Sequence, residues 1–355
     1  MRLPVSPPVS PMLARSVPEV PAPDALAGGV VYEPKWDGFR CIVFRDGDDV
    51  VLGSRGEKPL TRYFPEVVDA VRRELPERCV VDGELVVRTG PAGAERLDWE
   101  ALAQRIHPAA SRVDRLARES PASFVAFDLL ALGDDDLTGR PFRERRERLE
   151  TALAGVRAPV HLTQVTRDRD EAVRWFADFE GAGLDGVVAK GAASTYSPGK
   201  RTMLKVKHQR TADVVAVGYR VHTSGRGLGS LLLGLYDAEG TLRQVGGASA
   251  FTAARRVQLL EELEPFVLRD DRGEVVRGQG EPNRFTARKD SSFVRLRPEL
   301  VAEVRYDQLE GHRLRHAAQF VRWRPDRDPR SCGYDQLDVP VAYDLERVLT
   351  GTLPR

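Results

Sequence analysis

Short runs of apolar and β-branched residues, broken by Gly, Pro and Asp, alternate with helical patterns up to about residue 209. Strands mixed with helices in this way predict an α+β domain. The runs predict strands at 28–32, 41–44, 50–52, 79–87, 123–130, 159–164, 184–190 and 203–207. Helical spacing predicts helices at 67–75, 99–106, 143–153 and 170–179.

The pattern changes after residue 210, where short strands follow one another with Gly-rich turns. Several short strands with a single helix favour an OB-fold barrel. The strands are expected at 213–221, 228–236, 242–245, 291–296, 300–309 and 318–323, and the helix at 252–263, capped by Thr252. The predicted organisation is a first domain at 1–209, with a Pro-rich surface arm or partly disordered segment at 1–27, a second at 210–330 and a tail without a recognisable motif at 331–355.

The composition indicates the class of protein. With 41% hydrophobic and 30% charged residues, the 355-residue chain is typical of a soluble globular protein with two cores. No apolar run is long enough to span a bilayer, so we expect a cytoplasmic protein without a membrane partner. Cys41, Cys79 and Cys332 lack zinc spacing, so we expect them to be reduced and buried and expect no structural metal.

The charge is balanced overall but uneven along the chain. The net charge is +1, yet residues 190–226 carry eight Lys and Arg against one acidic residue, Asp213. Residues 312–330 carry six Arg against two Asp. Such basic blocks suggest a partner that presents phosphates, although ordinary solvated surface charge is the alternative.

Lys35 is the first candidate for chemistry. It follows a predicted strand that Pro34 ends, and the pair Asp37-Gly38 predicts a tight turn behind it. With Arg40 these residues form the spacing K-x-D-G-x-R, whereas an isolated lysine in such a place is usually only an exposed surface residue.

This spacing resembles the nucleotidyl-lysine motif shared by ATP-dependent DNA ligases, RNA ligases and mRNA capping enzymes. Further stretches from Ser54 to Arg327 resemble the other ligase motifs and follow in ligase order. The resemblance implies an ATP-grasp-like nucleotidyltransferase domain followed by an OB-fold, and it is strongest to the stand-alone bacterial ligase C type. Lys35 would then attack the α-phosphate of ATP and carry AMP covalently.

The resemblance also implies roles for residues that bind the nucleotide, the nick and a metal. Arg55 would contact the 5′-phosphate of the nick, and Phe127 would stack on adenine. Glu84, from the stretch Asp82-Gly83-Glu84, would contact the ribose or a metal, and carboxylates in a half-buried strand do need such a partner. The nucleotide is further expected to contact Arg40, Lys205 and Lys207 in the first domain, and Arg324, Asp326 and Arg327 in the second. Lys190 ends its predicted strand and is expected near the phosphates.

Four residues complete the candidate site, and one of them, Asp185, is a candidate metal ligand only through the resemblance to ligases. Lys205 and Lys207 alternate on one face of a strand, where they repel each other unless an anion lies between them. Together with Mg²⁺ or Mn²⁺ they would favour a neutral, nucleophilic Lys35. Glu33 could accept a hydrogen bond from the 6-amino group of adenine, whereas GTP carries an acceptor at that position and would be repelled. Asp185 stands where ligases usually have a metal-binding Glu and is one methylene shorter.

The sequence therefore predicts an ATP-dependent DNA ligase that seals nicked duplex DNA, acts as a monomer near the nucleoid and serves DNA repair. An RNA ligase or a capping guanylyltransferase is the alternative with the same lysine chemistry. A non-catalytic nucleic-acid-binding OB module joined to a degenerate enzyme is a third possibility, and it predicts DNA binding without adenylation.

Overall fold

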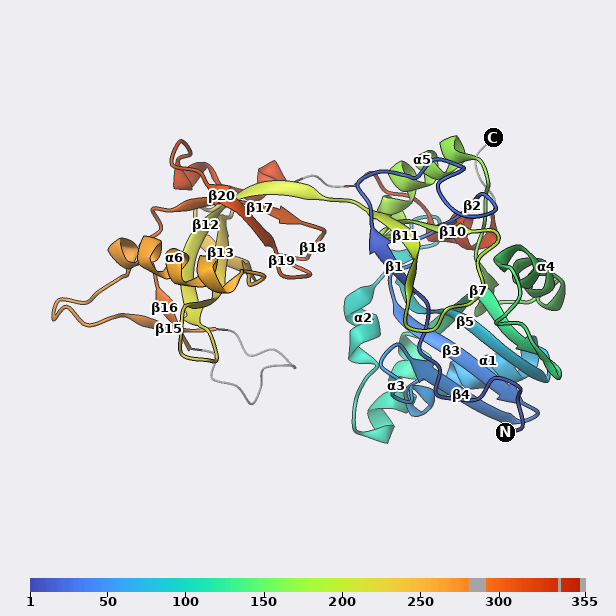
Figure 1. Cartoon of the computed structure of the whole chain (residues 1–355). Helices are drawn as coiled ribbons and strands as arrows, with labels where there is room; N and C mark the ends of the chain where they lie inside the picture. Colours follow the sequence, from blue (N-terminus) through green and yellow to red (C-terminus); the bar gives the residue numbers. More distant parts are fainter. Residues whose placement is uncertain (281–291, 338–339, 352–355) are drawn as a thin grey trace. The chain divides into compact units, whose positions relative to one another are not determined.

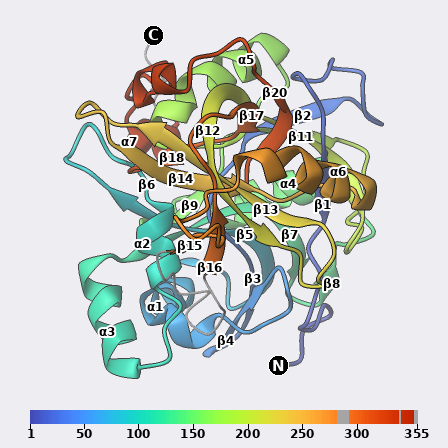
Figure 2. The ribbon, with the colours of Figure 1, turned by 90° about the vertical axis from the view of Figure 1, so that its left-hand side faces the viewer.

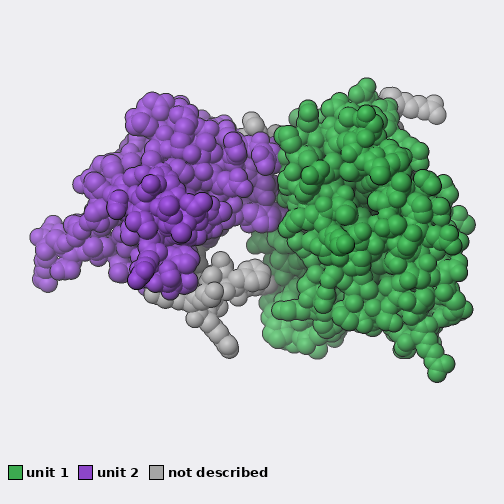
Figure 3. All heavy atoms as spheres, in the orientation of Figure 1, with its two compact units in different colours: residues 1–207, 340–355 green, residues 208–339 purple. Residues whose placement is uncertain are grey.

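The computed structural model describes residues 1–280, 292–337 and 340–351 and divides the chain into two units. Unit 1 contains residues 1–207 together with 340–355, and unit 2 contains residues 208–339 (Figure 3). The C-terminal segment thus belongs to unit 1, although the sequence placed it in a separate tail. The start of the strand predicted at 291–296 lies outside the described residues.

Unit 1 contains two sheets with helices on their outer sides (Figure 1). The smaller sheet has the order β1-β11-β10-β2 and consists of β1 (Leu13–Ser16), β2 (Val30–Pro34), β10 (Gly186–Gly191) and β11 (Arg201–Lys207). The larger has the order β4-β3-β5-β7-β8, with β6 and β9 added, and consists of β3 (Phe39–Asp46), β4 (Asp49–Ser54), β5 (Arg78–Thr89), β6 (Arg96–Leu97), β7 (Ala122–Leu132), β8 (Asp135–Asp136) and β9 (Val160–Leu162).

The helices of unit 1 cover these sheets, and α1 and α3 lie side by side on one flank (Figures 1 and 2). They are α1 (Pro65–Glu74), α2 (Trp99–Gln104), α3 (Ala110–Glu119), α4 (Phe142–Ala152), α5 (Arg169–Asp178) and α7 (Leu345–Thr350), with short 3₁₀ turns η1 (Thr61–Tyr63) and η2 (Phe179–Ala182). Apolar residues from both sheets share one cluster, for example Val30 and Val187 with Val86 and Val125. The sheets therefore pack on each other through a common core.

The N-terminal arm is part of a second apolar cluster, together with residues such as Ile42 and Met203, which corrects the expectation of a surface arm. Leu3, Val5 and Met12 are buried, and β1 pairs in parallel with β11. Prolines hide the periodicity of such a short edge strand. Strand β5 runs without a break through Asp82-Gly83-Glu84, a stretch with two poor strand formers, and only its register with β7 shifts there.

Unit 2 is a small barrel. Strand β12 pairs with both β13 and β17, β13 pairs with β14, and β17 pairs with β20. A bridge between Ala248 and Ala318 joins the two ends, so the barrel closes as in an OB-fold. Its elements are β12 (Arg210–Val221), β13 (Leu228–Tyr236), β14 (Leu242–Ala248), α6 (Ala253–Leu263), η3 (Glu264–Phe266), β15 (Arg277–Gln279), β16 (Ser292–Arg295), β17 (Val301–Tyr306), β18 (Leu309–Glu310), β19 (Arg313–Leu314), β20 (Gln319–Trp323), η4 (Pro329–Ser331) and η5 (Tyr334–Gln336).

Two smaller predictions are confirmed, the cap of α6 and the state of the cysteines. Thr252 caps α6, because its side chain accepts a hydrogen bond from the backbone N–H of Arg255. Cys41, Cys79 and Cys332 are free and buried. Among the residues that the structure describes, no helix is long and apolar enough to cross a membrane.

Candidate active site

Lys35 lies directly after β2, and neighbouring strands fix its backbone. Its N–H donates to the carbonyl of Gly186 at 2.8 Å, and its carbonyl accepts from the N–H of Asp185 at 3.0 Å. Gly38 has no left-handed backbone, but a Cβ there would overlap the carbonyl of Leu85. The motif therefore needs glycine for a close approach of two chain segments, not for the tight turn that the sequence suggested.

Asp185 lies between two of the predicted lysines. Its Oδ2 is 2.5 Å from Nζ of Lys35 and 2.6 Å from Nζ of Lys207. Burial raises the pKa of the Asp185 carboxyl, but Lys35 and Lys207 outweigh burial and hold the pKa below its usual range. The predicted nucleophile is therefore ion-paired with a carboxylate, whereas the sequence led us to expect mainly cations around it.

Lys205 lies on the same face of β11 as Lys207, as the alternation predicted. Burial, together with the charges of Lys35 and Lys207, lowers the pKa of the Lys205 ammonium group. The guanidinium of Arg55, which is exposed just after β4, adds to this effect. Lys35 and Lys207 thus pair with Asp185, and Lys205 and Arg55 add positive charge nearby, an arrangement suited to a polyphosphate.

A second group of polar residues surrounds Arg40 on the larger sheet. Arg40 forms two hydrogen bonds of 2.6 Å with Asp82, which is fully buried. The hydroxyl of Tyr196 donates to the same carboxylate at 2.7 Å and accepts from the N–H of Met12 at 3.2 Å. Glu84 lies opposite Arg40 in the register of β3 and β5, and burial raises its pKa to about 7 despite the charges of Arg40 and Lys35.

Phe127 lies near two cations. The guanidinium of Arg40 is 4.4 Å from the ring centroid of Phe127, and Nζ of Lys190 is 4.7 Å from it. The ring is only 6% exposed. Stacking of adenine on this ring stays a prediction, and the structure adds that Arg40 already covers part of the ring.

The position of the Lys190 side chain differs from the one expected, near the phosphates. Its Nζ is 2.8 Å from Oε2 of Glu33 and 3.2 Å from the carbonyl of Phe127, and both side chains of the ion pair are almost completely buried. Burial raises the pKa of Glu33 despite the charge of Lys190. Oε1 of Glu33 is buried and has no hydrogen-bond partner, so an acceptor remains available there.

Glu84 and Asp185 were the predicted metal ligands. Both lie near Lys35, but no group of three or more His, Cys, Asp or Glu able to hold a metal occurs among the described residues. Mg²⁺ usually binds one or two carboxylates and takes its remaining ligands from substrate phosphates and water. The two carboxylates therefore fit a magnesium ion that arrives with the nucleotide.

The basic residues predicted in unit 2 form their own network. Arg324 bonds to Asp326 and, at 3.1 Å, to both oxygens of Asp213, and Arg327 lies 3.4 Å from Asp213. Arg324 lowers the pKa of Asp326 to about 2. In the sequence, Asp213 was noted only as the single acidic residue of a basic block. In the structure its carboxylate forms ion pairs with Arg324 and Arg327, two of the predicted site residues.

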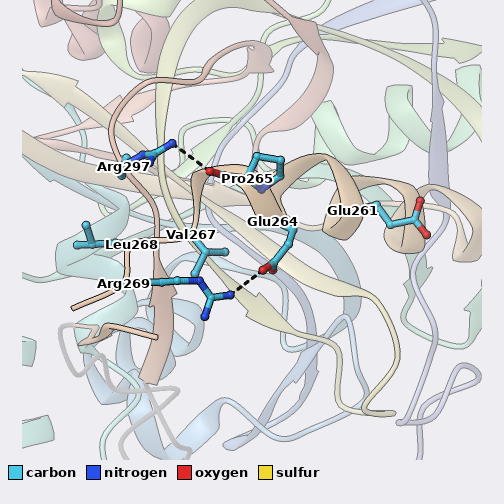
Figure 4. Close-up of a pocket in the computed structure, with 7 residues that line it drawn as sticks. All are labelled: Glu261, Glu264, Pro265, Val267, Leu268, Arg269 and Arg297. Atoms are coloured by element: carbon cyan, nitrogen blue, oxygen red, sulfur yellow. Dashed lines mark hydrogen bonds and ion pairs between the residues drawn. The ribbon is translucent and has the colours of Figure 1, made fainter. Parts of the chain in front are cut away.

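A pocket on unit 2, shown in Figure 4, contains none of the predicted site residues. It lies beside α6 and η3, where Arg269 bonds to Glu264 at 2.7 Å and Arg297 bonds to the carbonyl of Pro265 at 3.0 Å. Glu264, Arg269 and Arg297 thus bond within the protein, and we do not assign the pocket to the reaction.

The sequence missed residues that support the site rather than line it. Asp82, Tyr196 and Thr163, which accepts from Nε1 of Trp36 at 2.8 Å, hold neighbours of the predicted site residues. Asp82 belonged to the recognised Asp-Gly-Glu stretch, so its importance was visible. Tyr196 and Thr163 gave no local signal, because their partners are distant in the sequence.

The two packed sheets of unit 1, followed in the chain by the OB-fold of unit 2, define the class as a nucleotidyltransferase with an OB-fold domain. Comparison with known proteins gives the family. Residues 11–207 match the family model "ATP dependent DNA ligase domain", and residues 224–327 match "ATP dependent DNA ligase C terminal region". The chain belongs to the ATP-dependent DNA ligase family.

Curated relatives agree over the full length. The chain is 57% identical to DNA ligase C of Mycobacterium tuberculosis, covering 99% of both chains, and 58% identical to DNA ligase C2 of Mycolicibacterium smegmatis, covering 96% and 97%. A solved structure titled as a Lig E DNA ligase shares the fold, with a TM-score of 0.56 at 16% identity over 89% of this chain and 99% of that one. The chain is thus an ATP-dependent ligase that acts on nicked DNA, and the predicted fold class is confirmed.

Proposed function

We propose that Lys35 is the nucleophile that carries AMP during nick sealing. The lone pair of its Nζ forms a bond to the α-phosphorus of ATP, the bond to the bridging oxygen breaks, and pyrophosphate leaves. The proton of the attacking amine passes to solvent. The observation that carries this proposal is the gathering of Lys205, Lys207 and Arg55 around the Lys35–Asp185 pair, because these cations would neutralise the charge that develops on the phosphates.

The base and the ribose are assigned to the other end of the site. The free Oε1 of Glu33 would accept a hydrogen bond from the amino group of adenine. Guanine carries an acceptor at that position, so this contact would favour ATP. Phe127 would pack on the base and Arg40 and Glu84 would contact the ribose, while Lys190 acts as the buried counter-ion of Glu33.

A divalent cation, Mg²⁺ or Mn²⁺, would be held by Glu84 and Asp185 together with the phosphates, and it would supply additional neutralisation of the leaving group. Asp185 would exchange its contacts with Lys35 and Lys207 for the cation when the nucleotide binds. Both lysines would then be free to meet the phosphates.

The later steps involve DNA. AMP is transferred from Lys35 to the 5′-phosphate of the nick, and the 3′-hydroxyl displaces AMP as the new phosphodiester forms. Arg55 would contact the 5′-phosphate, and Arg324 and Arg327 would act on the nucleotide from unit 2. We assign the protein to DNA repair as a monomer that acts on the DNA of the cytoplasmic nucleoid.

The decisive experiment is adenylation with α-labelled ATP and Mg²⁺. We expect an acid-labile protein–AMP adduct that Lys35→Ala abolishes. Lys200→Ala, a change of an exposed lysine in the same unit, serves as the control and should label normally. An adduct that persists in Lys35→Ala, or none in the unaltered protein, overturns the proposal.

A second measurement separates the acceptors. Nicks with an all-DNA 3′ strand should be sealed at least as well as nicks with an RNA 3′-hydroxyl. Sealing of RNA-containing duplexes alone would support an RNA ligase, and labelling by GTP alone would support a capping-type enzyme.

A further inference from the structure

The segment 340–351, for which the sequence offered no motif, is built into unit 1. Helix α7 buries Leu345, Val348 and Leu349 in the same apolar cluster as Trp36, the residue that follows the proposed nucleophile. The N–H of Leu345 donates to the carbonyl of Glu95 at 2.9 Å. A helix of six residues is not stable alone, so this packing must hold it in place.

Gly181 in η2 provides the surface on which the backbone of this segment lies. Its φ is not positive, so no backbone conformation requires glycine there. An added Cβ would overlap the carbonyl oxygen of Val341 and lie 2.7 Å from the N of Tyr343. The ring of Tyr343 packs on Phe179, with centroids 5.3 Å apart. Glycine at 181 therefore permits docking of the C-terminal segment.

A short series of hydrogen bonds connects α7 to the nucleophile. The side-chain amide of Gln164 donates to the carbonyls of Val348 and Arg347 in the last turns of α7. The preceding residue, Thr163, is 1% exposed and accepts from Nε1 of Trp36 at 2.8 Å. Trp36 is bonded covalently to Lys35, so two adjacent residues after β9 contact both the C-terminal helix and the neighbour of the nucleophile.

We propose that α7 is a positioning element of the adenylation site. When docked it fixes residues 163 and 164, which hold Trp36 and thereby the direction of the Lys35 side chain. The inference rests on the proposed role of Lys35 as nucleophile. It assigns a part in the first chemical step to a segment that follows the OB-fold in the sequence.

The test uses the full chain with Gly181→Ala, which should release the segment. Gly139→Ala is the matched control, because Gly139 also has no positive φ and nothing lies within 4 Å of its added Cβ. Release is measured by hydrogen exchange of the amides of 345–350. In single-turnover adenylation, Gly181→Ala should lower the rate at saturating ATP by about fivefold to tenfold, the effect expected for losing one buried hydrogen bond. The KM for ATP should stay within about twofold, because the base and phosphate contacts are not altered.

Thr163→Val is the second variant, since it breaks the bond to Trp36 while leaving the segment docked. It should give a similar loss of rate, and the double variant should be no slower than either single one. The proposal would be overturned if the segment were released without loss of rate, or if the KM for ATP rose by the same factor as the rate fell. It would also be overturned if the rate losses of the two single variants multiplied in the double variant. If Gly181→Ala does not release the segment, the double variant Leu345→Ala, Val348→Ala replaces it. The same loss of rate and the same unchanged KM are then expected. Labelling of Lys35→Ala would instead refute the proposed nucleophile and leave the docking of α7 intact.

Discussion

Replacing Lys190 by Met tests whether this residue serves phosphate binding or the burial of Glu33. The side chains of the pair are only 3% and 4% exposed, and the ion pair is 2.8 Å long. Met has similar length and no charge, so the substitution leaves the Glu33 carboxylate buried without its partner. Removal of one member of a buried ion pair destabilises a protein by about 3 to 5 kcal/mol.

The pKa of Glu33 sets a limit on this cost. Burial already raises that pKa in the unaltered protein, and without Lys190 the carboxyl would take up a proton in the folded state. Protonation at pH 7 of a group whose ordinary pKa is 4.5 costs about 3 kcal/mol. The loss of stability should therefore be up to about 3 kcal/mol at pH 7 and should become smaller toward pH 5, because the unfolded carboxyl also becomes protonated there.

The assay is urea unfolding followed by tryptophan fluorescence between pH 5 and 8, since Trp36, Trp99 and Trp175 report on unit 1. Lys58→Met, at an exposed lysine of the same unit, is the control and should change the free energy of unfolding by less than about 0.5 kcal/mol. Glu33→Gln combined with Lys190→Met should recover part of the loss. A small, pH-independent change in stability with a large rise in the KM for ATP would refute this reasoning and favour phosphate binding.

Three further predictions concern titratable groups of unit 1. Burial raises the pKa of Glu84 to about 7, so adenylation should increase with pH through about 7, as its carboxylate forms, and Glu84→Gln should remove that rise in a pH series of adduct formation. Burial and the charge of Arg88 lower the pKa of His161 to about 4, so stability should fall as pH decreases from about 6.5 to 4, by up to about 3 kcal/mol, and less in His161→Gln, as measured by urea unfolding. Asp185→Asn should lower the free energy of unfolding by about 2 kcal/mol in urea unfolding, because the ammonium groups of Lys35 and Lys207 then lose their shared carboxylate. Asp185→Glu, which keeps the carboxylate, should still form the adduct with labelled ATP.

Local features of the fold could be predicted because their causes are local. The alternation at 203–207 correctly placed Lys205 and Lys207 on one face, and the Thr252 cap correctly marked the start of α6. The proximity of Lys35 and Asp185 was implied only by the ligase resemblance, because strand pairing sets it. Helix α3 was not predicted at all, and its N-cap residue, Ala109, makes no side-chain cap hydrogen bond.

The partners of the charged groups could not be predicted, because they depend on pairing across distant segments. Lys190 was assigned to phosphates since it ends a strand in a basic block, yet its partner is 157 residues earlier, at Glu33 on β2. Asp185 was read only as a metal ligand, since nothing in the sequence shows two ammonium groups within 2.6 Å of one oxygen. In both cases burial determines which groups must pair, and burial arises only when the two sheets pack together.

The arm at the start of the chain has a consequence for the lysines of β11. Without β1, β11 would be an edge strand with unpaired backbone groups on its outer side, and edge strands fray more easily than paired ones. In the structure the N–H of Val17 donates to the carbonyl of Lys205 at 3.0 Å, and Ser16 lies opposite Lys205 in the parallel register. The backbone that carries Lys205 is thus held from both sides. A domain boundary drawn after the Pro-rich arm would remove one of these supports, so the arm supports a residue that we propose to bind the nucleotide as well as the core of unit 1.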